Sequence, residues 1–411
     1  MKRDVVLLLG GNIMNYGIIR KYNDRGIYVF VVDWNEHPAL TGDKHYQIDV
    51  KDAQSIIEAL KQDNVIDRVI FAYSSIDLAV PSVAAINSRI GLKTITKEGL
   101  SYSSSKSRMT KKWEEVGLLN RESLCFTEYS DEIKELNCKT KIIVKPDNSA
   151  SSRGITIIER NSPTELLKFA FERAKSEASD GIVVVEEFVE GTEYTVEMVG
   201  DSFGNVCVYG ISRKTHTKNT DNNRIAVKLH YNSEDIQLQE RIANVGIKCY
   251  KALHFSCSLG HLEVIVKPDG SISPVEIGAR SSGNIASDLV DIVCGESFLD
   301  ELLRAQRGEA IQTGFHKQTD RCAMYYFYDF PADTFIQKEA TILDYCDNAI
   351  TSRFSDRRFL KIGTHFGRID SDNARYGYEI LEGPKSIMTP KYIERAEHCM
   401  MEDILGHGPS I

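Results

Sequence analysis

Two glutamates in a mostly apolar segment have the spacing of a divalent-metal site. Glu263 lies in the run 261–266 and Glu276 in the run 271–277, and the sequence 267–270 between them, Lys-Pro-Asp-Gly, is typical of a tight turn. The pattern predicts a β-hairpin with one acid on each strand. Two buried carboxylates on one face repel each other unless a cation lies between them. Mg²⁺, which binds one or two carboxylates together with phosphate oxygens, fits this pair.

The face on which each acid lies depends on the turn. A two-residue turn would place Glu263 opposite Pro274, with Glu276 diagonally beside it on the same face at ~7–8 Å. A three-residue loop would put the two acids on opposite faces unless the ladder contains a bulge. Pro274 favours a bulge because it cannot donate a ladder hydrogen bond. Acids that only protect an edge strand are the remaining alternative, and the sequence leaves all of these open.

Lys145 ends an apolar run and stands directly before the polar loop 147–154. Small hydroxyl residues let backbone N–H groups surround a phosphate, and flanking cations supply charge. A surface turn with ordinary cations beside it is the alternative. The loop residues suited to a phosphate are Ser151, Ser152, Arg153 and Gly154.

A second acidic motif follows an apolar strand. The run 183–185 ends in acids, turns at Gly191 and resumes. A purine amine needs an acceptor and a ribose diol needs a carboxylate, and Glu186 and Glu193 have the chemistry for both. Acidic hairpin ends are common, so this motif is weak when it stands alone.

The segment 213–230 is rich in cations. We expect some of them, Lys214 and Arg224 in particular, to contact a substrate carboxylate or a γ-phosphate. For each of these side chains taken singly, a solvated loop is an alternative of at least equal weight.

Composition excludes several classes of function. The chain has 411 residues and a net charge of −9, and its Lys and Arg are scattered, which argues against nucleic acid as the main partner. Nine cysteines without a C-x-x-C pair are typical of reduced thiols and a cytoplasmic protein. The apolar run Val5–Leu9 is too short for a membrane span or a signal segment and predicts a buried strand.

Strand and helix patterns alternate from residue 1 to about 95, which predicts a parallel α/β sheet. Its first turn, Gly10-Gly11-Asn12, and Asp33 have a partial likeness to a dinucleotide site. The glycines of G-x-G-x-x-G are missing, however, so a redox enzyme is disfavoured. The aromatic strand 324–330 either lines a pocket or, more in keeping with its alternation, belongs to the core.

These elements, in this order, resemble the ATP-grasp superfamily and particularly its carboxylate–amine ligases. The resemblance covers residues 100–290 well and the N-terminal segment more loosely. It implies an α/β and α+β multidomain fold: an N-terminal parallel α/β domain, an ATP-grasp fold and a C-terminal α+β subdomain. The implied domains are 1–100, 101–190 with the phosphate loop, 191–310 with the metal site, and 311–411.

The resemblance also implies a role for each motif. It assigns the ATP-phosphate lysines to Lys106 and Lys145, the phosphate-covering loop to 149–154, the adenine hinge to Glu186, Glu187 and Val189, the ribose carboxylate to Glu193, the magnesium ligands to Glu263 and Glu276, and the group that steadies the acyl phosphate to Arg280.

One position departs from the family pattern. The family often has E-I-N-P-R after the strand, whereas this chain has Glu276-Ile277-Gly278-Ala279-Arg280. Gly278 cannot ligate a second metal ion, so the resemblance implies one or two Mg²⁺ ions, with Mn²⁺ as a substitute. Water or Asn284 would then complete the shell.

The activity implied by the resemblance is amide or peptide bond formation through an acyl phosphate, with release of ADP and phosphate. An amino acid is the first choice of carboxylate, and the implied partners are small molecules, with a homodimer as one arrangement. Purine-pathway and carbamoyl-phosphate-type enzymes, and a nucleotide-binding pseudoenzyme, are the alternatives.

Overall fold

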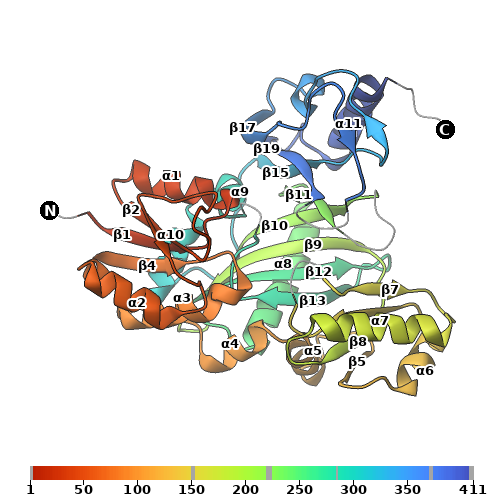
Figure 1. Ribbon diagram of the computed structural model, residues 1–411, viewed down its shortest axis with the longest axis horizontal. Helices are drawn as coiled ribbons and strands as arrows, with labels where there is room; N and C mark the ends of the chain where they lie inside the picture. Colours follow the sequence, from red (N-terminus) through yellow and green to blue (C-terminus); the bar gives the residue numbers. More distant parts are fainter. Residues whose placement is uncertain (1–2, 150–152, 219–224, 284–285, 370–373, 407–411) are drawn as a thin grey trace.

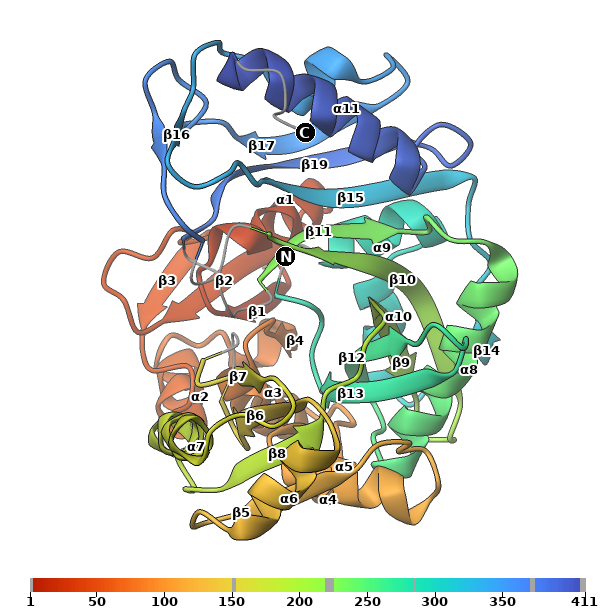
Figure 2. The ribbon, with the colours of Figure 1, turned by 90° about the vertical axis from the view of Figure 1, so that its right-hand side faces the viewer.

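The computed structural model describes residues 3–149, 153–218, 225–283, 286–369 and 374–406. In Figure 1 the N-terminal sheet lies at the left, a long curved sheet crosses the centre, a small sheet lies at the lower right and the C-terminal elements lie above. Figure 2 turns this view and shows the small sheet beneath the curved one. Among the residues just named, no helix is both long and apolar enough to cross a membrane.

The N-terminal part forms the parallel sheet that the alternating pattern predicts. Its strand β1 (Val5–Leu9) is buried at every residue and pairs in parallel on both sides, as expected for a central strand with both faces covered. The spatial order is β3 (Lys44–Gln47), β2 (Tyr28–Asp33), β1 and β4 (Val69–Tyr73). The helical elements around it are η1 (Ile13–Asn15), α1 (Tyr16–Asp24), α2 (Ala53–Gln62), η2 (Ile66–Arg68), η3 (Asp77–Ala79) and α3 (Val80–Arg89).

A small antiparallel sheet follows in the chain. It contains, in spatial order, β5 (Ser123–Phe126), β8 (Val183–Glu187), β6 (Ile142–Pro146) and β7 (Thr156–Ile158). The helices of this part are α4 (Lys97–Ser103), α5 (Lys106–Glu115), α6 (Asp131–Lys139) and α7 (Thr164–Glu177). Helix α5 begins at Lys106 because the Ser105 side chain accepts a hydrogen bond from the Arg108 backbone N–H, which satisfies a free donor of the first turn.

The central sheet runs without a break from the predicted hairpin to the C-terminal strands. Its spatial order is β13 (Ile272–Gly278), β12 (Ser258–Val266), β9 (Thr192–Gly200), β10 (Val206–His216), β11 (Ala226–Tyr231), β15 (Arg321–Tyr328), β19 (Tyr376–Pro384) and β17 (Thr351–Asp356), with β14 (Gly314–Phe315) paired to β10. The helices beside it are α8 (Ile236–Ala252), α9 (Ala286–Cys294) and α10 (Phe298–Gln306). The C-terminal part adds β16 (Thr334–Phe335), η4 (Ile342–Tyr345), β18 (His365–Phe366) and α11 (Pro390–Leu405).

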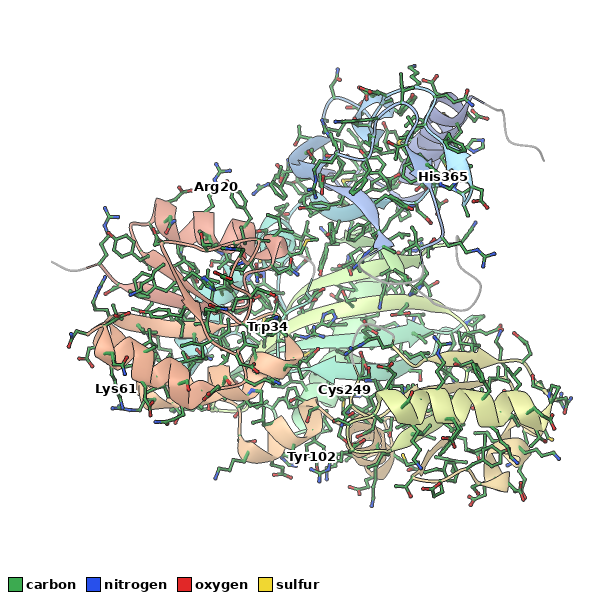
Figure 3. All side chains as sticks on the ribbon, in the orientation of Figure 1. Arg20, Trp34, Lys61, Tyr102, Cys249 and His365 are labelled. Carbon is green, nitrogen blue, oxygen red and sulfur yellow. The ribbon has the colours of Figure 1, made fainter. Side chains whose placement is uncertain are left out.

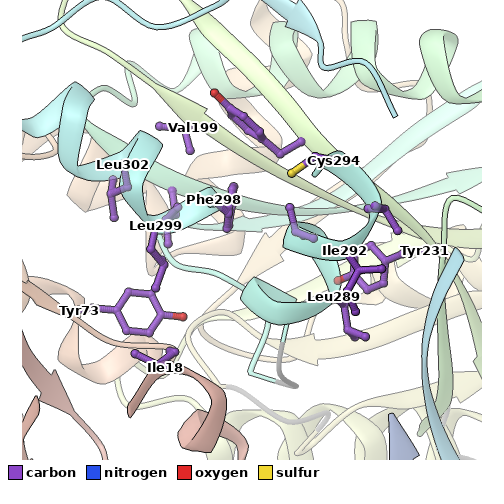
Figure 4. Packing of buried hydrophobic residues seen from close by; sticks show 14 of the residues in the cluster. Ile18, Tyr73, Val199, Tyr231, Leu289, Ile292, Cys294, Phe298, Leu299 and Leu302 are labelled. Carbon is purple, nitrogen blue, oxygen red and sulfur yellow. The ribbon is translucent and has the colours of Figure 1, made fainter. Parts of the chain in front are cut away.

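One hydrophobic core joins the N-terminal sheet to the central sheet. Tyr73 of β4, Leu289 of α9, Phe298 of α10 and Tyr231 of β11 belong to the same buried cluster, part of which Figure 4 shows. Helices α9 and α10 therefore lie between the two sheets and fix the position of the parallel sheet relative to the central one.

The α/β and α+β fold class predicted from the sequence is confirmed. The aromatic run 325–328 is fully buried core, as its alternation indicated. Strand β15 lies in the same sheet as β11, so the domain boundary near residue 310 stays a prediction.

Candidate active site

The hairpin β12–β13 places Glu263 directly opposite Glu276. The backbone N–H of Lys267 donates to Ser271 O at 2.9 Å, which closes a loop of three residues, 268–270. A bulge then shifts the register between Glu263 and Val264, so that Val264 pairs with Pro274. Residues directly opposite each other in an antiparallel ladder share a face. The bulge is therefore what brings both carboxylates to the same side.

The neighbouring strands extend this polar face. Strand β9 carries Glu193 and Glu197, which lie on one face because side chains alternate along a strand. Lys214 of β10 reaches across, and its Nζ donates to Glu193 Oε1 at 2.6 Å and to Glu263 Oε1 at 2.7 Å. Burial raises the pKa of Glu263 more than Lys214 lowers it, and the nearby Glu193 and Glu276 raise it further. One lysine therefore does not fully compensate the burial of the Glu263 carboxylate, and a further cation would stabilise its ionised form.

The solvated-loop alternative is wrong for those residues of the cationic segment that lie in strands β10 and β11. Residues 213–216 end strand β10, and residues 226–230 pair with it in β11, because their alternating apolar side chains are buried on the sheet. Lys214 is thereby aimed at the carboxylates. Arg224 lies outside the described residues.

Lys106 connects Glu276 to the predicted phosphate loop. Its Nζ lies 3.1 Å from Glu276 Oε2 and donates to Ser149 O at 2.9 Å. Burial acts to raise the pKa of Glu276, but the neighbouring cations, Lys106 above all, outweigh it and hold this pKa at about 2. Ser151 and Ser152 lie outside the described residues, whereas Gly154 is described and has a positive φ of 72°.

Lys145 is buried in an ion cluster with Glu186. Its Nζ donates to Glu186 Oε2 at 2.7 Å, and Arg121 donates to both oxygens of the same carboxylate at 3.2 Å. Arg121 also donates to Ser273 Oγ at 3.0 Å, so it links the small sheet to the hairpin. The carboxylate of Glu186 is occupied by these donors, and its predicted contact with adenine stays a prediction.

A cavity of about 130 Å³ lies between the small sheet and the central sheet. One wall is apolar and includes Ile143 and Ile157, and the predicted hinge residues Glu187 and Val189 lie beside them. The other side carries the charged residues described above: Lys145, Glu193, Lys214 and Glu263. An apolar slot with a few convergent charges is typical of a small-molecule site. A larger cavity, of about 630 Å³, lies between β10, β11, β15 and α11 and contains none of these hairpin carboxylates.

Arg280 follows β13 and is held by an acid of the N-terminal domain. Its Nε and Nη2 donate to Asp77 Oδ1 and Oδ2, each at 2.7 Å. The Ser281 hydroxyl contacts the hydroxyl of Tyr73. Arg280, to which the resemblance assigned the acyl phosphate, and the adjoining Ser281 therefore lie against the carboxyl end of the parallel sheet.

Three functional candidates were missed in the sequence. Glu197 is fully buried, and its Oε1 lies 2.6 Å from His261 Nδ1, on the same face as Glu263. The signal for it was the spacing of polar residues at every second position of β9. Arg121 and Asp77 gave no local signal, since their partners lie 65 and 203 residues away in the chain.

Residues 138–288 match the ATP-grasp domain family. The chain contains an ATP-grasp domain. This confirms the resemblance drawn from the sequence. A segment of 99 residues, 24% of the chain, is 34% identical to phosphoribosylamine–glycine ligase of Leptospira interrogans and spans 22% of that relative's length.

Solved structures share the whole fold. The L-amino acid ligase of Bacillus licheniformis has a TM-score of 0.70 at 16% identity, over 98% of both chains. Phosphoribosylglycinamide synthetase of Anaerococcus prevotii has a TM-score of 0.67 at 16% identity, over 98% of this chain and 99% of that one. N5-carboxyaminoimidazole synthetase of Staphylococcus aureus, complexed with ADP, has a TM-score of 0.66 at 12% identity, over 98% of both chains. At identities this low, the similarity shows only that these proteins share a fold.

Replacing Lys145 by alanine is expected to weaken ATP binding by about tenfold or more, because a charge-assisted phosphate contact is worth roughly 1.5–3 kcal/mol. Titration of ATP into the variant by calorimetry measures the change. Lys139→Ala removes an exposed lysine of the same subdomain and is the control, with unchanged affinity expected. Equal ATP affinity in wild type and Lys145→Ala would remove Lys145 from the phosphate site.

Proposed function

We propose that this protein is an ATP-dependent carboxylate–amine ligase that forms an amide bond through an acyl phosphate. The observation that carries the proposal is the opposed pair Glu263–Glu276, with a lysine on each acid, beside a cavity between two sheets. A carboxylate is a poor electrophile, and phosphorylation gives it a good leaving group. Phosphoryl transfer depends on positioned cations rather than on a protein nucleophile, and this face supplies such cations.

The residues divide the task by chemistry. Lys106 and Lys145 would bind the phosphates, Glu187 and Val189 would contact the base, and Glu193 would accept from the ribose. Arg280 would hold the oxygens of the carboxylate that becomes activated. Its planar fork of donors suits a carboxylate or a phosphoryl group. The loop after Lys145 would close over the phosphates and exclude water, which hydrolyses acyl phosphates.

Glu263 and Glu276 suit Mg²⁺. Both are carboxylates on one face, and an ammonium group stands against each of them, Lys214 on one and Lys106 on the other. In the described ranges no cluster of three or more acidic, imidazole or thiol side chains forms a complete metal cage. Mg²⁺ at this pair would share its coordination with phosphate oxygens and would neutralise the charge that develops in the transfer.

The N-terminal crevice favours an amino-acid carboxylate over a phosphoribosyl substrate. A phosphate needs free backbone N–H groups at a glycine turn or a helix N-terminus. Here the Gly11 N–H donates to Asp33 Oδ2 at 2.8 Å. At the start of α1, the Asp288 carboxylate lies so close to Gly17 that a Cβ there would be 1.7 Å from its Oδ2. Two acids thus stand where a phosphate would have to bind.

The test is release of ADP and phosphate from Mg·ATP in the presence of pooled amino acids and simple carboxylates, with and without an amine. We expect ADP release that requires both a carboxylate and an amine. Release of AMP would replace the acyl phosphate by an adenylate. Turnover only with a phosphoribosylamine would overturn the amino-acid assignment, and ATP binding without turnover on any pool would favour a pseudoenzyme.

A further inference from the structure

The cavity of about 630 Å³ between the central sheet and helix α11 is separate from the proposed active site. Among the described residues, its lining includes none of Glu263, Glu276 and Arg280. A molecule bound there would not meet the groups that activate a carboxylate, so it would be neither the reacting carboxylate nor the attacking amine. Ligand cavities commonly have volumes of ~300–1,000 Å³. This cavity therefore has the size for a small molecule that the proposed reaction does not use.

The side of the cavity formed by the sheet carries basic side chains in two cross-strand rows. Arg213 of β10 lies directly opposite His230 of β11, and Thr215 lies directly opposite Lys228. Directly opposed residues share a face of the sheet, and so do residues two apart on one strand. Lys214, whose ammonium contacts acids of the active site, stands between Arg213 and Thr215 and therefore lies on the other face. The two rows thus belong to the cavity under α11.

His230 has a buried ring nitrogen without a partner. The residue is 3% exposed, and its Nε2 has no hydrogen-bond partner in the part of the chain that the structure describes. Burial first, and then the charge of Arg213, lower the pKa of His230 to about 3, although a hydrogen bond with the Met388 backbone acts to raise it. That bond belongs to Nδ1, since Nε2 has no partner. The neutral ring therefore keeps Nε2 as an acceptor, and a buried acceptor left unpaired costs stability.

The side of the cavity formed by α11 carries acids. Glu397 is engaged by Lys228, whose Nζ donates to its Oε2 at 2.5 Å. The carboxylate of Glu394 has no ion pair or hydrogen bond within the described ranges. Across from these acids, the Arg213 side chain is 36% exposed, and its contact with Glu234 is as long as 3.5 Å. The cavity thus offers a basic group on one side and an acidic group on the other.

The remaining lining is largely apolar and includes Met324, Phe330, Ile393 and Met401. The charged residues of the lining balance one another: Arg213, Lys218 and Lys228 are basic, and Asp329, Glu394 and Glu397 are acidic. A site without net charge favours neither an anion such as a phosphate nor a simple cation. It suits a zwitterion whose two charges lie on an apolar body, which is the chemistry of an amino acid.

We propose that this cavity binds a free amino acid or a short peptide, with its carboxylate at Arg213 and its ammonium group at His230 and Glu394. The ligand would lie next to the nucleotide without joining the reaction. His216 lines both this cavity and the ATP cavity, and its Nε2 lies 3.1 Å from Glu193 Oε2. The chain would then have a site for an amino acid in addition to the substrate sites of the proposed function.

The test measures binding of L-leucine and of L-alanyl-L-leucine by calorimetry, without ATP and without turnover. Two analogues of leucine serve as matched ligands: 4-methylpentanoate lacks the ammonium group, and 3-methylbutylamine lacks the carboxylate. At least one of the two zwitterions is expected to bind. Each leucine analogue is expected to bind at least about tenfold more weakly than leucine, because it loses a charge-assisted hydrogen bond. Binding of neither zwitterion to wild type would overturn the proposal.

Three variants locate the bound zwitterion. Arg213→Gln removes the carboxylate partner and is expected to weaken binding at least about tenfold. Ala332→Trp fills the cavity from a half-buried lining position without removing a charge, and is expected to abolish binding. Arg280→Ala is expected to keep it, since Arg280 lies outside this cavity. Arg395→Gln, which removes an exposed arginine of α11 that does not line the cavity, is the matched control and should bind like wild type.

Binding retained in either Arg213→Gln or Ala332→Trp would overturn the proposal, and so would binding lost in Arg280→Ala, which would place the zwitterion at the reacting centre. Thermal unfolding of each variant shows whether it is folded. The result is independent of ADP release. Absence of amine-dependent ADP release would contradict the proposed function, whereas zwitterion binding lost in the two cavity variants would still support this site.

Discussion

Glu276→Gln is expected to lower turnover by about a thousandfold while the protein stays folded. The change removes a negative charge that faces Glu263 and pairs with Lys106. Metal-ion stabilisation of a transferred phosphoryl group contributes several kcal/mol, and each ~1.4 kcal/mol corresponds to a factor of ten in rate. The Glu276 side chain is 36% exposed and its partner Lys106 also donates to Ser149 O, so the fold should tolerate the change at a modest loss of stability.

The experiment compares amine-dependent ADP release with thermal unfolding for the same variant. Asp269→Asn, an isosteric change at the exposed turn of the same hairpin, serves as the control and should keep full activity. Activity close to that of wild type in Glu276→Gln would remove this residue from the metal site. A loss of both activity and the folded state would leave Lys106→Met as the variant that separates charge from folding.

Glu186→Gln is expected to destabilise the protein by about 3–5 kcal/mol, because it leaves buried cations without their counter-ion. The side chains of Lys145 and Arg121 are only 4% and 3% exposed, and Glu186 is the carboxylate that both of them contact. Urea unfolding at neutral pH measures the change. Glu190→Gln, at an exposed position four residues on, is the control and should change stability by less than about 0.5 kcal/mol.

The same pair predicts a specific acid dependence. Burial alone would raise the pKa of Glu186, but Lys145 and Arg121 lower it to about 2 from an ordinary 4.5. A carboxyl whose pKa is lower in the folded state stabilises the fold above its unfolded pKa, and this stabilisation is lost as the pH falls through the folded pKa. Wild type should therefore lose stability between about pH 4.5 and 2, and Glu186→Gln should lose less. Parallel curves for the two proteins would contradict the assignment.

Local patterns in the sequence predicted the elements and most of the candidate site. Apolar runs such as 5–9 predicted parallel strands because a strand with both faces covered has no polar positions. The turn at 267–270 predicted the hairpin and so the proximity of Glu263 and Glu276. The register of the hairpin could not be predicted, because it depends on whether β13 contains a bulge, and the structure has one extra residue there, Val275.

Long-range partners were also beyond prediction. Asp77 and Arg280 are an ordinary acid and an ordinary base in the sequence, and only the packing of the parallel sheet on the central sheet brings them together. The strands at 213–216 and 226–230 were obscured by their cations, of which Lys214 contacts the carboxylates of the site and Lys228 pairs with Glu397 of α11. Trp34, which directly follows β2 and is labelled in Figure 3, is half exposed, and no role was predicted for it from the sequence.

The continuous central sheet has a consequence for how the protein can be shortened. Strand β11 pairs with β15 through backbone hydrogen bonds, and β15 in turn pairs with β19. A fragment ending near residue 310 would keep the hairpin acids and the lysines, yet it would present one open edge of β11 to solvent. Unpaired strand edges recruit other chains. Such a fragment should form aggregates rather than a minimal enzyme, because the last hundred residues supply the strands that cover the edge of β11.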